Sequence, residues 1–367
     1  MSDTPTGLEW LESLSPWPAV FGLHRMRALL ASLGEPQRAF RAVHVVGTNG
    51  KTTTTLMCAA LLHSAGLQAG AYVSPHVRGW QERVQVDGEP ADLERVLARV
   101  RLHAAGATQF EVLTAAAFTE FSKRKVDVAV VEAGLGGRHD ATNVLAAPVV
   151  VLTNVALDHT EHLGSTREAI AAEKLAVVTP GAVVVLGEPE WEAEARSRGA
   201  SRVEVLSGSN LGLAVAAAEA YLSGRVDPRP AEALQIPGRL ERRSGHPLEI
   251  WDGAHNVAGV GHLLGRLPPR RFTIVASILE DKNVDAMLRA LSTVGDALVA
   301  TRSANTRALA ADKLASRAQR YFARVETVAD PREALGRARA LAGADGAVLV
   351  TGSLYLLAEL SVSEEKP

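Results

Sequence analysis

The segment Val43-His44-Val45-Val46-Gly47-Thr48-Asn49-Gly50-Lys51-Thr52-Thr53 decides the fold, because an apolar β-branched run leads directly into a turn bracketed by glycines. The next residues, 54–62, are apolar and are expected to be helical. A strand, a glycine turn and a helix are the context of a phosphate-binding loop, where backbone N–H groups and the helix N-terminus hold phosphate oxygens. In such a loop Lys51 would reach the terminal phosphates, and the hydroxyl of Thr52 or Thr53 would hold Mg²⁺.

This loop departs from the general pattern in one respect. The first glycine of G-x-x-x-x-G-K-T would fall at Val45, whereas the spacing here is G-x-x-G-K-T. The alternative is an ordinary strand-to-helix turn that contains glycines, but such a turn does not require a lysine at the start of the helix. We therefore predict a nucleotide-binding protein.

Composition limits the class of protein. The 367 residues suffice for two domains, and 47% hydrophobic with 22% charged residues is typical of a globular protein. The net charge of −2 gives no support for a nucleic-acid or membrane-surface partner. One cysteine, Cys58, allows no internal disulfide, and residues 1–9 lack the pattern of a signal peptide. No apolar run approaches the roughly 20 residues of a membrane helix. We expect a cytoplasmic monomer.

Short β-branched runs alternate with alanine- and leucine-rich segments, which predicts an α/β fold with parallel sheets and crossover helices. Strands are expected at residues 41–46, 70–73, 126–132, 148–154, 182–186, 248–252, 272–276, 297–301 and 347–351, with a small hairpin at 83–89. Helices are expected at residues 52–64, 93–103, 110–124, 166–177, 210–222, 257–267, 284–291, 308–322, 331–341 and 354–360.

A stretch rich in proline and glycine at residues 224–238 interrupts this series and predicts a domain boundary. We expect a P-loop ATP-binding domain at residues 1–236, a hinge or linker at 237–245, and a smaller Rossmann-like α/β domain at 246–367. Because the phosphate loop lies in the first domain and residues 252–256 lie in the second, we expect closure about the hinge to complete the site.

Two polar residues stand at the ends of apolar strands, where α/β proteins place ligands. Glu132 ends the run at 126–132, so it would bind Mg²⁺ beside ATP phosphates or form a salt bridge with Arg138. His159 follows the run at 148–154 and is either a phosphate or metal residue or a hydrogen-bonded structural histidine. The spacing of its acidic and histidine neighbours is not that of a compact zinc site.

Three further residues allow two interpretations each. Lys174 lies in a helical segment, where a lysine without other context is expected on the surface. Arg239, at the domain junction, is either a phosphate contact or an ordinary linker residue. Asp252 follows the run at 248–251, where it would accept a hydrogen bond from a ribose hydroxyl or cap the next helix.

Taken in order, these motifs resemble the folylpolyglutamate synthase/dihydrofolate synthase family, within the Mur-ligase-like ATP-dependent amide ligases. Each motif alone is weak, but the ordered series over nearly the whole chain is specific. The matching segments are residues 21–26, 47–51, 74–76, 108–111, 132–138, 140–144, 157–161, 173–174, 237–241, 252–256 and 351–356.

The resemblance implies roles for residues of the first domain. The β- and γ-phosphates of ATP would be held by Lys51 and by the loop backbone of Gly47, Thr48, Asn49 and Gly50. Glu132 would bind Mg²⁺, and His159 and Ser74 would serve a second Mg²⁺. Lys174 aligns with a lysine that family members carry as a carbamate, which replaces its surface interpretation.

In the second domain the resemblance implies that Arg239 approaches the phosphates from the hinge, and that Asp252 and His255 close the nucleotide site. This domain would also bind L-glutamate. Two departures stand out. The family loop continues Gly-Lys-Gly-Ser, so the Mg²⁺ ligand is either Thr52 or Thr53 here. Residues 205–210 are abbreviated, and we expect the strands and the His-Gln pair that precede the helix at 210–219 in the family to be absent.

The implied activity is the ATP- and Mg²⁺-dependent addition of L-glutamate to dihydropteroate, to folylmonoglutamate, or to both, through an acyl phosphate. One alternative is a peptidoglycan Mur ligase, suggested by Lys51-Thr52-Thr53, although those enzymes carry an additional domain before the loop. The other is a regulatory nucleotide-binding ATPase without ligase chemistry, which would not need Lys174 or Ser74.

Overall fold

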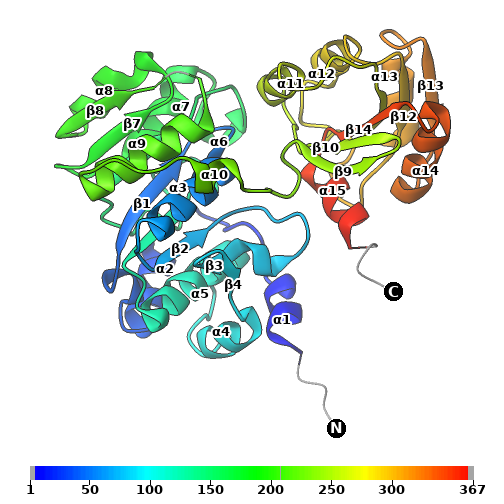
Figure 1. Cartoon of the computed structure of the whole chain (residues 1–367). Coiled ribbons are helices and arrows are strands. Elements are labelled where there is room, and N and C mark those ends of the chain that lie inside the picture. The colour runs from blue at the N-terminus through cyan, green and yellow to red at the C-terminus, as the bar shows by residue number, and fades with distance from the viewer. Residues whose placement is uncertain (1–4, 207, 363–367) are drawn as a thin grey trace. The chain divides into compact units, whose positions relative to one another are not determined.

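The computed structural model describes residues 5–206 and 208–362. They form two compact units. The first takes in the described residues up to Ser74 together with Trp80–Leu234, and the second takes in Pro75–Gly79 and the described residues from Gln235 onward. In each unit helices cover a predominantly parallel sheet (Figure 1), which confirms the predicted α/β class. None of the helices in the described ranges has the length and apolar character needed to cross a membrane.

An eight-stranded sheet of order β4-β3-β2-β5-β1-β6-β7-β8 forms the centre of the first unit. Its strands are β1 (Arg41–Val46), β2 (Ala69–Tyr72), β3 (Val84–Val86), β4 (Glu89–Pro90), β5 (Val128–Glu132), β6 (Val149–Leu152), β7 (Val183–Leu186) and β8 (Arg202–Val205). All neighbours from β2 to β8 pair in parallel, and β3 and β4 add an antiparallel hairpin. The carboxyl ends of β1, β5 and β6 therefore meet at one edge of the sheet.

Both faces of this sheet are covered, which explains why its central strands are predominantly apolar. Side chains alternate along β1, so that Ala42 and Val46 join the core on one face and Val43 and Val45 join the core on the other. Helices α1 (Gly7–Ser13), α2 (His24–Ser32), α4 (Leu93–Val100), α5 (Gln109–Arg124), α6 (Thr160–Leu163), α7 (Arg167–Lys174) and α8 (Glu192–Ser197) pack on the first face. Helices α3 (Lys51–Ser64), α9 (Asn210–Leu222) and α10 (Arg229–Glu232) pack on the second.

Strand β8 corrects an expectation. A strand does precede α9, and it pairs in parallel with β7. Its sequence, Arg-Val-Glu-Val, is half-exposed because β8 is the edge strand, so it lacks the apolar run by which the central strands were recognised. Helices α1 and α2 were likewise not predicted, and several predicted helices end two or more residues earlier in the structure, as α4 does at Val100.

The second unit has a six-stranded sheet of order β13-β12-β11-β14-β10-β9. Its strands are β9 (Glu241–Gly245), β10 (Leu248–Trp251), β11 (Thr273–Ala276), β12 (Ala297–Ala300), β13 (Arg324–Thr327) and β14 (Ala347–Thr351), with only β9 antiparallel to its neighbour. Its helices are α11 (Val257–Leu264), α12 (Val284–Leu291), α13 (Ala311–Ala318), α14 (Pro331–Ala342) and α15 (Leu354–Ser361).

Helices α11, α12 and α13 pack on one face of this sheet, and α14 and α15 pack on the other together with Val77. The polar edge strands β9 and β13 were not predicted, for the same reason as β8. Residues 241–245, which fall in the expected linker, form β9 and pair with β10.

Candidate active site

The turn after β1 has the geometry of a phosphate loop. Gly50 has a φ of 82° directly before α3, a conformation that glycine adopts without steric cost. A Cβ atom on Gly47, whose φ is 147°, would lie 1.9 Å from Thr153 Oγ1. Lys51 is the first residue of α3, and its Nζ donates to the carbonyl oxygen of Thr48 at 3.2 Å. Lys51 therefore folds back over the loop that would receive the phosphates.

The end of the neighbouring strand β6 holds this loop. Thr153 Oγ1 donates to the carbonyl oxygen of Asn49 at 2.7 Å, and Asn154 Nδ2 donates to the same oxygen at 2.9 Å. The Asn49 N–H donates in turn to Asn154 Oδ1 at 3.0 Å, and the Thr48 N–H donates to the Asn154 carbonyl oxygen at 2.9 Å. Sequence reasoning gave no role to these two side chains, although they follow an apolar strand beside the loop as Glu132 does.

Glu132 ends β5 with its side chain buried, at the level of Val45 in the paired strand β1. Its Oε1 accepts a hydrogen bond from Thr52 Oγ1 at 3.2 Å, and its Oε2 accepts one from the Ser74 N–H at 3.1 Å. Among the described residues, the threonine that reaches Glu132 is Thr52 and not Thr53, which is itself buried. The predicted alternative, a salt bridge to Arg138, is not formed, because Arg138 pairs with Glu173 at 3.0 Å.

These oxygens suit Mg²⁺, which prefers a few carboxylate and hydroxyl ligands completed by phosphate and water. No cluster of three or more acidic, histidine or cysteine side chains that could hold a metal occurs within residues 5–206 and 208–362. The Thr52 and Glu132 oxygens fit an ion that completes its coordination with phosphate and water.

Lys174, the last residue of α7, is only 3% exposed and is not the surface lysine that its sequence context alone favours. Its Nζ donates to the carbonyl oxygen of Gly47 at 2.7 Å, so it lies directly behind the phosphate loop. Burial, and after it the charge of Lys51, lowers the pKa of Lys174 to about 7. A substantial fraction of this amine is therefore neutral, and nucleophilic, near pH 7.

The glycine-rich segment after β5 packs on the end of α7. A Cβ atom on Gly137 would lie 2.5 Å from the Lys174 carbonyl oxygen and 2.7 Å from that of Glu173, so only glycine fits there. The Arg138 N–H donates to the Glu173 carbonyl oxygen at 3.0 Å. The glycines of this motif thus allow the close approach that fixes the backbone at Lys174.

The buried side chain of Asp140 holds the same glycine-rich segment after β5. Its carboxylate accepts from the Leu135 N–H at 2.8 Å and from the Thr142 hydroxyl at 2.5 Å, and burial raises the pKa of Asp140. Because the Thr142 hydroxyl donates to Asp140, it accepts from His44 Nε2, which lies 2.8 Å away in β1. Burial lowers the pKa of His44 to about 4, so this histidine is neutral.

His159 lies immediately before α6, with a φ of 50° and a partly exposed side chain. Its Nδ1 lies 4.0 Å from Glu161 Oε1. The segment that leads to it is tied to the phosphate loop, because the Ala156 N–H donates to Thr48 Oγ1 at 3.1 Å. The end of β6 therefore carries both the residues that hold the loop and His159.

In the second unit the turn after β10 is held by its own carboxylate. Asp252 Oδ2 accepts from the Leu240 N–H at 2.8 Å, and Oδ1 accepts from the Ala254 N–H at 2.9 Å. Burial raises the pKa of Asp252, against the opposing charge of Arg239. The capping role considered for Asp252 belongs to Asn256, whose side chain accepts from the Gly259 N–H at the start of α11.

The other two predicted residues of this unit lie beside that turn. Arg239 Nη1 donates to the Gly238 carbonyl oxygen at 3.1 Å, and His255 Nδ1 lies 2.9 Å from the Gly253 carbonyl oxygen. Of the predicted site residues, the structure therefore gathers Lys51, Thr52, Ser74, Glu132 and Lys174 in the first unit, and Arg239, Asp252 and His255 in the second.

Comparison with known families assigns both units. The Mur ligase middle domain family matches residues 45–221, and the Mur ligase glutamate ligase domain family matches residues 238–354. A dihydrofolate synthase/folylpolyglutamate synthase of Mycobacterium tuberculosis is 34% identical, over 87% of this chain and 82% of that protein.

Solved structures agree with this assignment. The structure of Mycobacterium tuberculosis folylpolyglutamate synthase complexed with ADP matches with a TM-score of 0.89 and 32% identity, over 98% of this chain and 97% of that one. The bifunctional enzyme of Yersinia pestis with Mn, AMPPNP and L-glutamate bound matches with a TM-score of 0.87 and 27% identity, over 98% of each chain. The chain belongs to the folylpolyglutamate synthase/dihydrofolate synthase family of Mur-type ATP-dependent ligases.

Proposed function

We propose that this protein joins L-glutamate to the carboxylate of dihydropteroate, of a folylmonoglutamate, or of both, at the expense of ATP. The observation that carries the proposal is the arrangement around the phosphate loop, where Lys51, the Thr52–Glu132 pair and the buried Lys174 meet within one unit. The similarity to family members solved with ADP, or with AMPPNP and L-glutamate, supports ATP and glutamate as the common substrates.

The reaction has two steps. The γ-phosphoryl group of ATP passes to the acceptor carboxylate, giving an acyl phosphate and ADP. The amino group of glutamate then attacks the acyl carbon, and an amide forms as inorganic phosphate leaves. In the first step Lys51 leaves the Thr48 carbonyl oxygen and donates to the phosphate oxygens, where its charge stabilises the negative charge that develops during transfer.

Thr52 and Glu132 would hold one Mg²⁺ ion, and Ser74 and His159 would serve a second one. When bound, the ions neutralise charge on the transferred group. The Thr52 hydroxyl already hydrogen-bonds Glu132 at 3.2 Å, so these two oxygens need little rearrangement to share one cation.

Lys174 has a more specific role in this proposal, as a carbamate. Its neutral amine would react with bicarbonate, forming a C–N bond as water leaves, which replaces a cation behind the phosphate loop by an anion. The lowered pKa of Lys174 supports this, because only the neutral amine reacts. The carbamate oxygens would then orient the second metal region.

The activity is tested with the purified protein, Mg²⁺ and ATP, with dihydropteroate and tetrahydrofolate offered in parallel. We expect ADP to form only when one of these acceptors and glutamate are both present. ADP formation that does not depend on glutamate would favour the regulatory ATPase instead. If neither dihydropteroate nor tetrahydrofolate supports ADP formation, the proposed substrates are refuted.

The carbamate is tested separately with Lys174→Ala and Lys174→Arg. We expect both variants to bind ATP but to lose most of their turnover, and short-chain carboxylates to restore part of the activity of Lys174→Ala by replacing the carbamate. Near-normal turnover of either variant would show that Lys174 is dispensable.

A further inference from the structure

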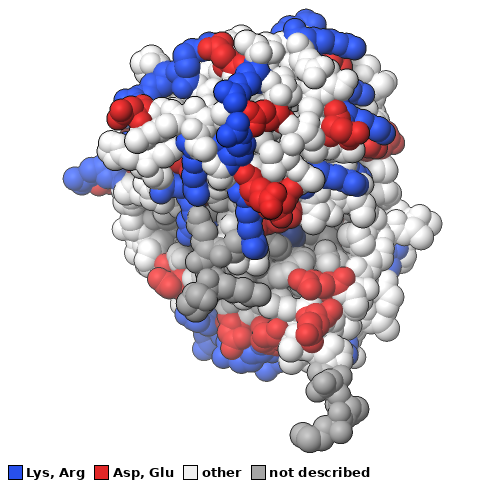
Figure 2. Space-filling model, turned by 90° about the vertical axis from the view of Figure 1, so that its right-hand side faces the viewer, with Lys and Arg blue, Asp and Glu red and all other residues white. Residues whose placement is uncertain are grey.

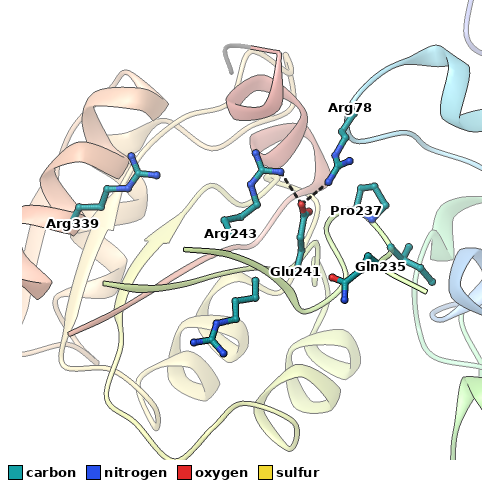
Figure 3. Close-up of a pocket in the computed structure, with 8 residues that line it drawn as sticks. Arg78, Gln235, Pro237, Glu241, Arg243 and Arg339 are labelled. Carbon is teal, nitrogen blue, oxygen red and sulfur yellow. Dashed lines mark hydrogen bonds and ion pairs between the residues drawn. The ribbon is translucent and has the colours of Figure 1, made fainter. Parts of the chain in front are cut away.

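The second unit contains a cavity of about 440 Å³ that none of the residues assigned to ATP or Mg²⁺ lines. Its volume falls in the range of small-ligand sites, but its walls are polar and cationic. The lining residues are Arg78, Gln235, Ile236, Pro237, Glu241, Arg242, Arg243 and Arg339. Figure 3 shows the side chains of Arg78 and Arg243 converging on Glu241, with Gln235 and Pro237 beside them.

Two buried carboxylates hold three of these arginines in place, Arg78, Arg243 and Arg339. Glu241, at the start of β9, is 8% exposed, and its Oε1 accepts from Arg78 at 2.9 Å and from Arg243 at 2.8 Å. Although burial alone would raise it, hydrogen bonds from Gly238, Arg243 and Arg78 hold the pKa of Glu241 below its usual range, so this carboxylate is ionised.

The second carboxylate is Glu249 in β10, which is fully buried. It forms a two-point ion pair with Arg339 of α14, at 2.7 and 3.0 Å, and accepts from Trp251 Nε1 at 2.7 Å. The Arg243 guanidinium stacks over the ring of the same Trp251, with its Cζ 4.6 Å from the ring centroid. Arg78, Arg243 and Arg339 are thus held in place before any ligand arrives, which lowers the entropic cost of binding.

Arginine is the commonest residue in the lining of this cavity. Four of its eight lining residues are arginines, and one, Glu241, is acidic. This enrichment is local, because the whole chain carries a net charge of −2. On the face drawn in Figure 2, Lys and Arg side chains are interspersed with Asp and Glu, which is not the broad basic surface of a nucleic-acid-binding protein.

We propose that this cavity is an accessory site for the carboxylates of a glutamyl chain, such as the tail of a polyglutamylated product. Planar guanidinium groups bind carboxylates through paired hydrogen bonds, and a chain with several carboxylates can engage several arginines at once. The inference rests on the proposed function, since that reaction generates such chains. The cavity also lies in the unit whose residues 238–354 match the glutamate ligase domain.

The test is calorimetric titration of the full-length protein with tri-γ-L-glutamate, at low ionic strength. We expect the wild type to bind, and Arg78→Gln to bind at least about tenfold more weakly, because the variant lacks one of the guanidinium groups that would pair with a carboxylate. Arg78 lies in the 75–79 loop with half of its side chain exposed, so it can be replaced without opening the core. Arg243→Lys keeps the charge but loses the planar fork, so it should also weaken binding.

The matched control is Arg337→Gln, on α14 of the same unit, which removes an exposed arginine that pairs with Glu326 outside the cavity. It should bind as the wild type does. Equal affinity in Arg78→Gln and wild type, or an absence of binding by the wild type, overturns the proposal. Tighter binding of inorganic phosphate than of tri-γ-L-glutamate would overturn the carboxylate assignment.

These outcomes are separable from those of the ligase assay. With dihydropteroate, which carries no glutamyl chain, Arg78→Gln should form ADP as fast as wild type. If the wild type itself forms no ADP with either acceptor, the proposed function is refuted. Unchanged binding of tri-γ-L-glutamate by Arg78→Gln refutes only the accessory site.

Discussion

The two units each place a polar turn after a buried parallel strand, but they stabilise it in different ways. The turn after β1 is held from outside, by Thr153 and Asn154 at the end of β6 and by Lys174 at the end of α7. The turn after β10 is held in part by its own carboxylate, because Asp252 Oδ1 accepts from the Ala254 N–H within the turn and Oδ2 accepts from the Leu240 N–H that precedes β9.

In the first unit, this difference places the proposed catalytic side chains and the side chains that hold the turn largely on different residues. In the first unit the side chains that would meet ATP, Lys51 and Thr52, are not the ones that keep the turn in shape. In the second unit the polar side chain at the strand end is itself part of the turn. We therefore expect substitutions of Lys51 or Thr52 to affect catalysis, those of Thr153 or Asn154 to affect folding, and those of Lys174 or Asp252 to combine both effects.

The largest effect is expected for Lys51→Ala. In the proposed mechanism the lysine charge stabilises the transferred phosphoryl group, so its removal should lower ADP formation by at least about 100-fold. The folded state loses one hydrogen bond at a partly exposed site, so the midpoint of thermal unfolding should change by only a few degrees. Steady-state ADP assays and thermal melts on the same preparation check this. A large fall in the melting midpoint would mean that Lys51 supports the turn, and the contrast between the two units would fail.

A smaller effect on turnover, with a clear loss of stability, is expected for Gly47→Ala. The new Cβ would lie 1.9 Å from Thr153 Oγ1 and would displace the side chain that holds the Asn49 carbonyl oxygen. We expect a loss of about 1–3 kcal/mol in the free energy of unfolding and a decrease of more than about tenfold in ADP formation.

Gly336→Ala, in α14, provides the control, because its Cβ would meet no atom within 4 Å. Alanine favours a helix over glycine by up to about 1 kcal/mol, so this variant should be as stable as wild type or more so. Denaturant unfolding distinguishes the two variants. Equal stability of Gly47→Ala and Gly336→Ala would show that the loop tolerates a side chain at position 47.

The sequence predicted the parts of this fold that repeat a strong pattern. The buried strands β1, β5 and β6 carry apolar residues on both faces, and the glycine turn with Lys51 has a recognisable spacing. These strands, the turn before α3 and the place of Glu132 at a strand end were therefore predicted. The edge strands β8, β9 and β13 were missed, because they are half polar and each pairs with only one neighbouring strand.

Local sequence could not locate the contacts that join distant elements. Nothing around Lys174 indicates burial, since its partner is the Gly47 carbonyl oxygen 127 residues away. The same holds for His44 and Thr142, which are 98 residues apart. The resemblance to a family indicated a role for Lys174, but the physical basis of its altered pKa became evident only from the packing around it.

The next prediction concerns the second turn. Asp252→Ala removes the acceptor for two backbone N–H groups in a buried turn, which should cost about 2 kcal/mol in the free energy of unfolding. Denaturant titration measures this, with Asp345→Ala as the control, because Asp345 is exposed. If Asp252→Ala is as stable as the control, the turn does not depend on its carboxylate, and the two units are more alike than we infer.

The smallest expected effect is the pH dependence of activation by bicarbonate. The proposed carbamate forms from the neutral amine of Lys174 and bicarbonate with loss of water, so no proton is released and only the neutral fraction of the amine changes with pH. With the pKa of Lys174 at about 7, that fraction rises from about one half at pH 7 to about nine tenths at pH 8. The bicarbonate concentration for half-maximal ADP formation should therefore fall just under twofold across this interval. This concentration is determined from activities normalised to their maximum at each pH. Steps that do not involve bicarbonate therefore do not change it. Lys174→Ala should show no bicarbonate activation at either pH, and a half-maximal concentration that stays constant or rises in the wild type would mean that the amine is already neutral at pH 7 or that it is not the group that reacts.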